Sequence, residues 1–158
     1  MKILVIGNCG VGKTWLMKSL IKHFKAEKRQ KIGKFYYHTN DQVIVIGKYD
    51  GNTFEGSDRL SMAVVSDLDA FLKYTEGKTI IAEGDRFTNN TYISKATPTI
   101  IKILGDGSEG RTKRGSNQTE RHIKSIQTRV KNINSHYEVE NSIFAFQLII
   151  KLITDDKQ

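Results

Sequence analysis

Apolar residues along this chain follow two alternating spacings. Some form short unbroken runs rich in β-branched residues, such as KILVI near the start, and these runs predict buried strands. Others recur every three or four positions, as from Lys13 to Phe24, and this spacing predicts a helix with one apolar face. Strands are predicted at residues 2–6, 35–38, 42–48, 78–83 and 99–104, with 136–140 a candidate for a further strand. Helices are predicted at residues 13–24, 66–74, 89–95, 123–133 and 142–153.

Strands that alternate with helices predict a mostly parallel sheet covered by helices on both faces. The chain has 158 residues, a length that fits one domain with a core of its own. It contains no internal repeat and no low-complexity tract. We therefore expect a single α/β domain over residues 1–158, with three layers and a central sheet of about five strands.

The junction between the first strand and the first helix carries the motif with the clearest chemistry. Residues 7–14 read GNCGVGKT and match the pattern GxxxxGK[ST] in full. Glycines in such a loop let backbone N–H groups wrap around phosphates, and the helix that follows adds the positive end of its dipole. Lys13 is expected to reach the β- and γ-phosphates, and the Thr14 hydroxyl is expected to bind Mg²⁺. The residues expected to contact the nucleotide are Gly7, Gly10, Val11, Gly12, Lys13, Thr14 and Trp15.

This motif is specific. From average residue frequencies, a random chain of this length matches it with a probability of roughly half a percent. The match also lies where the mechanism needs it, between a buried strand and an amphipathic helix. The sequence therefore predicts a three-layer P-loop NTPase fold that binds a nucleoside triphosphate, most simply ATP, together with Mg²⁺.

A P-loop alone does not separate kinases from GTPases, ATPases or motors. The guanine-reading NKxD tetrapeptide and the DxxG motif are absent, which disfavours a GTPase switch. Over most of its length the chain resembles the P-loop nucleoside and nucleotide kinases. Two segments, KYDGNTFEGSDRLSMAV and EGDRF, also resemble small P-loop kinases encoded by bacteriophages. The resemblance implies phosphoryl transfer to a small acceptor.

In those kinases the strand beside the P-loop strand ends in an acidic residue followed by arginine. Here TIIAEGDRF supplies Glu83, Asp85 and Arg86 at a strand end, where ligands of open α/β sheets bind. By resemblance, one carboxylate orients or deprotonates the acceptor hydroxyl, or holds Mg²⁺ through water, and Arg86 binds a phosphate. Asp85 is preferred because it directly precedes the arginine, and Glu83 remains open.

The same kinases close an arginine-rich lid over the phosphates. The segment at about 105–121 carries Arg111, Lys113 and Arg114, with Arg121 on the helix that follows. The resemblance implies that these cations exclude water and neutralise charge on the transferring phosphoryl group. The four glycines and the lack of periodicity predict a mobile loop, and a basic loop without a lid role is the alternative.

A second glycine-rich and charged segment, YDGNTFEGSDR, is expected to face the acceptor. Asp50, Asp58 and Arg59 are candidates for contacts to a sugar or a base, and Tyr49 and Phe54 are candidates for stacking on it. The alternative is a connecting loop with no role in binding.

Composition adds the charge of the surface and the compartment. The formal net charge is +8, with Lys and Arg gathered in residues 18–34 and 111–131. Such a surface favours anionic partners, so DNA is a possible partner beside nucleotides. The single cysteine, Cys9, excludes an internal disulfide, and no apolar run is long enough to cross a bilayer. We expect a cytoplasmic protein, in the host cytoplasm if it is viral, with no membrane partner.

Three functions remain open at this point. The leading hypothesis is an ATP-dependent kinase that transfers the γ-phosphoryl group to a nucleoside, a nucleotide or a related small acceptor. The second is a kinase acting on DNA or on a modified base in it, which the basic charge favours. The third is a non-catalytic nucleotide-binding regulator. The acceptor, the preferred donor base and the oligomeric state do not follow from the sequence.

Overall fold

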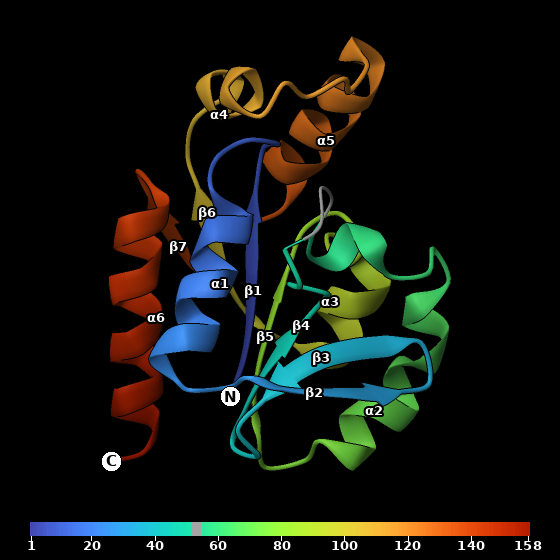
Figure 1. Ribbon diagram of the computed structural model, residues 1–158, viewed down its shortest axis with the longest axis vertical. Coiled ribbons are helices and arrows are strands. Elements are labelled where there is room, and N and C mark those ends of the chain that lie inside the picture. The colour runs from blue at the N-terminus through green and yellow to red at the C-terminus, as the bar shows by residue number, and fades with distance from the viewer. Residues whose placement is uncertain (52–54) are drawn as a thin grey trace.

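A computed structural model of the chain describes residues 1–51 and 55–158 (Figure 1). In these residues the strands form one seven-stranded sheet in the order β2-β3-β4-β5-β1-β6-β7. Strands β4, β5, β1, β6 and β7 run parallel, and β2 and β3 add an antiparallel edge beside β4. The strands are β1 (Lys2–Gly7), β2 (Lys28–Ile32), β3 (Phe35–Thr39), β4 (Val43–Ile46), β5 (Thr79–Glu83), β6 (Thr99–Ile103) and β7 (Tyr137–Val139).

Helices cover both faces of the sheet, which gives the three layers that the sequence predicts. The helices are α1 (Lys13–His23), α2 (Leu68–Tyr74), α3 (Asn90–Ala96), α4 (Ser108–Lys113), α5 (Glu120–Asn132) and α6 (Ser142–Asp156). Short 3₁₀ turns, η1 (Ser57–Arg59) and η2 (Val64–Asp67), precede α2. Figure 1 shows α1 and α6 side by side on one face, and α2 and α3 lie on the other face together with the packed side of α5. None of the helices among the described residues is long and apolar enough to span a bilayer.

The buried side chains form two cores, one on each face of the sheet, and successive side chains of β1 point alternately into one and the other. Ile3 and Val5 pack under α1 and α6, whereas Leu4 and Ile6 pack under α2, α3 and α5. All four are fully buried, because a central parallel strand is covered on both faces. The apolar run is therefore continuous in sequence although it serves two separate clusters.

The parallel pairing brings the carboxyl ends of the central strands to one edge. Gly7 at the end of β1 pairs with Ile103 of β6, and Val5 pairs with Glu83 at the end of β5. The loop that follows β1 therefore emerges between the ends of β5 and β6. Ligands of open α/β sheets bind at this edge.

The sheet has seven strands and not about five. The segment 136–140 does contain a strand, β7, whereas β2 was not predicted from the sequence. Strand β2 reads KRQKI, with three basic residues and no apolar alternation, because it is an edge strand whose side chains are largely exposed. Charged edge strands of this kind resist pairing with other chains and carry a weak sequence signal.

The segment at 105–121 also differs from the prediction of a mobile, irregular loop. It contains the short helix α4, which begins after Gly107 in left-handed backbone (φ 72°). This helix has only six residues, with Gly107 before it and Gly110 within it. It is too short to show helical periodicity, so the pattern of apolar residues could not reveal it.

Candidate functional site

A cleft of about 1330 Å³ opens at the carboxyl edge of the parallel strands. Its walls are the β1–α1 loop, the outer face of α1, the end of β5, residues 55 and 58, and the α4–α5 region that rises above the sheet in Figure 1. Of the residues that the sequence nominates, it is lined by Gly7, Gly10, Gly12, Lys13, Thr14, Trp15, Asp58, Glu83, Asp85, Arg86, Lys113 and Arg114. Segments far apart in sequence therefore meet at one cavity, called the central cleft below.

The glycine loop (Gly7–Thr14) is held in a shape that only glycine adopts easily. Gly10 and Gly12 have φ of 95° and 94°. Gly12 is the N-cap of α1, and no side chain caps the first turn of that helix. The N–H groups of this turn are therefore available to a ligand at the positive end of the helix dipole.

Lys13 lies across this loop. Its ammonium donates hydrogen bonds to the carbonyl oxygens of Gly7 (2.7 Å) and Asn8 (3.0 Å). Both contacts lie at the rim of the central cleft, and an anion in the loop would replace these neutral carbonyl acceptors with charged oxygens. The strand-to-helix junction is partly covered, and Gly10, Gly12, Lys13 and Thr14 line the central cleft.

Glu83 ends β5 and is almost fully buried, with 5% of its surface exposed. Its Oε1 accepts hydrogen bonds from the Tyr49 hydroxyl (2.9 Å) and from the backbone N–H of Ser57 (3.3 Å). Burial raises the pKa of Glu83, the charge of Asp58 raises it further, and the nearby Lys13 ammonium opposes them. A buried carboxylate is thus positioned opposite the lysine of the glycine loop.

Gly56 makes room for this carboxylate. A Cβ at that position would lie 2.6 Å from Glu83 Oε1, and the backbone there has φ of 95°. The charged segment after β4 therefore does approach the site, through backbone contacts that its sequence does not reveal. Glu83 is confined on three sides, by Tyr49, Gly56 and Ser57.

Asp85 and Arg86 follow on the turn after β5. Asp85 forms an ion pair with Arg129 of α5, which ties the β5 turn to the helix above it. Arg86 is held more loosely, by hydrogen bonds of 3.4 Å to the carbonyl oxygens of Leu60 and Asp58. The guanidinium of Arg86, which lines the central cleft, is therefore available to bind an anion there.

Helix α4 packs directly against the backbone of the glycine loop. A Cβ on Gly107 would lie 1.8 Å from the carbonyl oxygen of Cys9, and one on Gly110 would lie 2.0 Å from that of Gly10. Arg111 donates a hydrogen bond of 2.8 Å to the same Cys9 oxygen. Gly107 and Gly110 thus serve close backbone packing.

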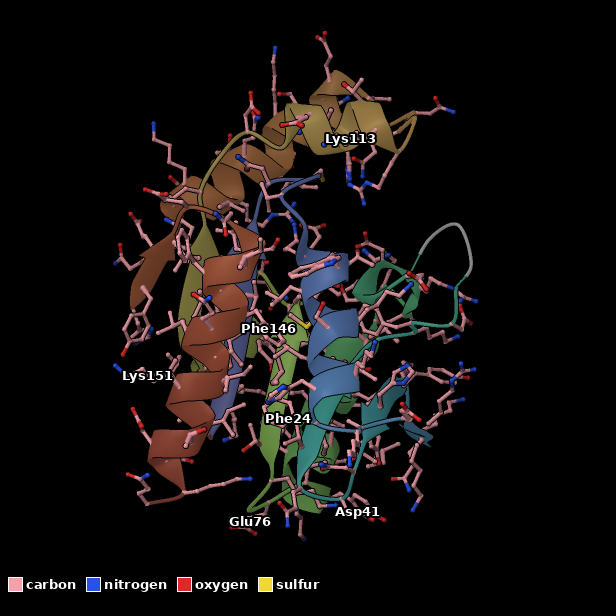
Figure 2. The ribbon with its side chains drawn as sticks, turned by 60° about the vertical axis from the view of Figure 1, so that its left-hand side comes forward. Phe24, Asp41, Glu76, Lys113, Phe146 and Lys151 are labelled. Carbon is pink, nitrogen blue, oxygen red and sulfur yellow. The ribbon has the colours of Figure 1, made fainter. Side chains whose placement is uncertain are left out.

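This arrangement separates the basic residues of that segment. Lys113 and Arg114 line the central cleft, and Figure 2 shows Lys113 on α4 at the upper end of the molecule. Arg111 braces the glycine loop and does not line the central cleft, and Arg121 is exposed on α5 away from its lining.

The residues nominated to contact the acceptor are also divided. Asp58 lines the central cleft, whereas Asp50 and Arg59 form an ion pair of 2.6 Å outside its lining. Tyr49 is buried and holds Glu83, so its ring is not free to stack on a base. Phe54 lies outside the described residues.

Sequence reasoning missed three supports of the site: Tyr49 and Ser57 at Glu83, and Arg129 at Asp85. These contacts join residues 26 to 44 positions apart, so no local pattern indicates them. Val11 lies in the loop but faces away from the central cleft, with its side chain against the α1–α6 core.

Among residues 1–51 and 55–158, no group of three or more His, Cys, Asp or Glu side chains is placed to hold a metal ion by itself. Mg²⁺ at nucleotide sites is normally bound by one or two protein oxygens together with substrate phosphates and water, so the Thr14 hydroxyl, which lines the central cleft, is a donor that fits it. Comparison of the sequence with protein-family models and with curated proteins finds no match.

Proposed function

We propose that this protein is an ATP-dependent kinase that transfers the γ-phosphoryl group to a nucleoside, a nucleotide or a related small acceptor. One observation carries the proposal. The glycine loop with Lys13 and the buried carboxylate of Glu83, which come from adjacent parallel strands, open onto the same cleft. A phosphate-binding loop that faces a buried carboxylate supports phosphoryl-transfer chemistry, and the space beside them leaves room for an acceptor.

The donor half of the site is the glycine loop. The uncapped N–H groups of α1 and the loop backbone would bind the β- and γ-phosphates. Lys13 would exchange its two carbonyl partners for phosphate oxygens. Mg²⁺, when bound with the nucleotide, would neutralise charge on the phosphates, and Thr14 would supply a protein oxygen for it.

The acceptor half is the end of β5. Burial raises the pKa of Glu83, which makes its carboxylate a stronger base toward an acceptor hydroxyl. Asp85 carries the same chemistry but is paired with Arg129, so the geometry favours Glu83 over Asp85 in this role. Arg86, Lys113 and Arg114 line the same space.

The size of the central cleft supports a reaction between two substrates. Its volume of about 1330 Å³ exceeds the roughly 300–1,000 Å³ that is typical of a pocket for one small ligand. Cations at its rim would neutralise the phosphoryl group in transit, and binding both substrates side by side supplies the positioning on which this chemistry depends.

The experiment that tests the proposal measures transfer of a labelled γ-phosphate from ATP to nucleosides, nucleoside monophosphates and single-stranded DNA. We expect transfer to one of the small acceptors, and its loss by at least a hundredfold in Lys13→Ala. Lys73→Ala is the matched control, because Lys73 is an exposed lysine on α2 outside the central cleft. Circular dichroism of both variants establishes that the fold is retained.

The same assay separates the competing functions. Transfer to DNA alone would establish the second hypothesis, a kinase acting on DNA. Binding of ATP without transfer to any acceptor would support the regulator. Transfer that Lys13→Ala leaves unchanged would remove the proposed mechanism.

A further inference from the structure

We propose that the indole ring of Trp15 is the platform on which the base of the donor nucleotide stacks, and that the protein selects this base by stacking alone. The inference rests on the proposed function, because it assumes that the phosphates of the donor occupy the glycine loop. It adds the donor class: purine nucleoside triphosphates in general.

Trp15 lies on the one face of α1 that borders the central cleft. Together with Lys18, Ser19 and Lys22 it follows the helical spacing of i, i+3, i+4 and i+7, and all four line the central cleft. Trp15 is the member nearest the glycine loop, one residue after Thr14. A nucleotide whose phosphates lie in that loop would therefore extend its nucleoside along this face.

The exposure of Trp15 has no explanation in packing. The core face of α1 is complete without it, since Leu16, Met17 and Leu20 are fully buried. The indole keeps 49% of its surface exposed although it is the largest apolar side chain of the helix. A large aromatic ring left open beside a cleft indicates a binding surface.

The ring is also held in place. Phe146 of α6 lies against it, with ring centroids 6.5 Å apart and planes inclined by 59°, and Figure 2 shows Phe146 between α6 and α1. Phe146 is itself in edge contact with His23 of α1. Trp15 is therefore supported by Phe146 while about half of its surface stays accessible, which reduces the entropy lost when a base stacks on it.

Stacking sets the expected selectivity. Every base has an aromatic face, so a stacking platform tolerates different bases and favours the larger purines. The tetrapeptide that reads guanine is absent from the chain. We therefore expect ATP and GTP to bind within a few-fold of each other, CTP more weakly, and tripolyphosphate, which has no base, about ten-fold more weakly than ATP.

The experiment exploits the fact that the chain contains one tryptophan. Mg²⁺ complexes of ATP, GTP, CTP and tripolyphosphate are titrated into the protein, with intrinsic fluorescence and calorimetry as readouts. ATP and GTP are expected to quench the fluorescence, and tripolyphosphate is expected to bind without doing so. By calorimetry, Trp15→Ala should lower ATP affinity to that of tripolyphosphate, and Trp15→Phe should restore most of it.

Tyr74→Ala is the matched control, because Tyr74 is an exposed aromatic residue on α2 that does not line the central cleft. Equal affinity of the wild-type protein for ATP and tripolyphosphate, or full ATP affinity in Trp15→Ala, overturns the stacking platform while the proposed kinase stands. Rejection of GTP overturns selection by stacking alone. If neither ATP nor tripolyphosphate binds, the proposed function fails and the inference fails with it.

Discussion

The Tyr49 hydroxyl donates a hydrogen bond of 2.9 Å to Glu83 Oε1, and both side chains are buried. The two residues lie 34 positions apart: Glu83 ends β5, and Tyr49 follows the end of the neighbouring strand β4 at Ile46. Burial and the Glu83 carboxylate raise the pKa of Tyr49 well above its ordinary value, so the phenol remains a hydrogen-bond donor at any physiological pH. A carboxylate that faces the glycine loop is thereby fixed by a permanent donor behind it.

Tyr49→Phe should change the pH dependence of activity and lower the stability without abolishing activity. The bond from Tyr49 lowers the pKa of Glu83, so its loss should raise that pKa and move the acid limb of the kcat/KM profile to higher pH. The free energy of unfolding should fall by about 1–2 kcal/mol, because a buried carboxylate loses one of its donors. Urea denaturation and a pH–rate profile measure both effects. Tyr74→Phe is the control, and an acid limb that does not move would contradict a role for Tyr49 in setting this pKa.

Glu83→Gln should separate activity from stability. We expect the transfer rate to fall by about 10²–10⁴-fold, the range for loss of a general base. The free energy of unfolding at pH 7 should stay equal or rise, because the amide can still accept the bond from Tyr49 and no charge is buried.

The raised pKa of Glu83 determines how this residue makes stability depend on pH. A raised pKa means that the folded state binds more protons than the unfolded state between the ordinary value of 4.5 and the folded value. The contribution of Glu83 is therefore fully present below about pH 4.5 and is lost as the pH rises through its folded pKa. Glu83→Gln should remove this decline, as denaturation at a series of pH values would show.

The activity of a second variant tests which carboxylate is the base. A larger loss of activity in Asp85→Asn than in Glu83→Gln would make Asp85 the base.

Much of the fold follows from the apolar pattern alone. The sequence signal is strong for the apolar runs of β1, β5 and β6, because these strands are buried on both faces. It is also strong for α1, because one whole face of this helix is buried. Strand β2 has no such face, so its charged sequence gives no signal. The central strand and the loop after it were accordingly predictable, and the edge of the sheet was not.

The candidate site likewise has a part that could be predicted from the sequence and a part that could not. The glycine loop is local, eight consecutive residues, and the sequence contains its whole motif. The choice between Glu83 and Asp85 depends on partners distant in sequence, Tyr49 for the first and Arg129 for the second. Arg111 was expected over the phosphates, and whether an arginine faces a ligand or a backbone carbonyl is decided by tertiary packing.

The contribution of His38 to stability should be lost as the pH drops below about 6.5, opposite in direction to the contribution of Glu83. His38 is buried in β3, and its Nε2 accepts a hydrogen bond of 3.3 Å from the backbone N–H of Tyr49. Burial lowers the pKa of His38, and Arg29 lowers it further, while Asp50 and Glu55 oppose them. The unfolded state, in which histidine titrates near pH 6.5, therefore binds more protons in this window, and protonation favours unfolding.

His38→Gln should flatten that dependence below about pH 6.5, as thermal unfolding at several pH values would show. His122→Gln, at an exposed position, is the control. An unchanged slope in His38→Gln would exclude His38 as the titrating group.

Gly107→Ala should detach α4 from the glycine loop. Its new Cβ would collide with the Cys9 carbonyl at 1.8 Å, where the obstacle is backbone and has little freedom to move. Because α4 has no buried residue, the melting temperature should change little, whereas affinity for Mg²⁺–ATP should fall by about ten-fold or more as the loop loses its brace. Calorimetric titration measures the affinity.

Gly115→Ala is the matched control for this variant. Gly115 also has a positive φ, of 59°, so alanine carries a similar backbone cost of roughly 1–2 kcal/mol. Nothing lies within 4 Å of its added Cβ, so the collision is absent. The two substitutions differ in the contact with the glycine loop, and they differ also in that Gly115 lines the central cleft whereas Gly107 does not. Wild-type affinity for Mg²⁺–ATP in Gly107→Ala would mean that docking of α4 does not shape the proposed nucleotide site, and a loss larger than that in Gly115→Ala would mean that it does.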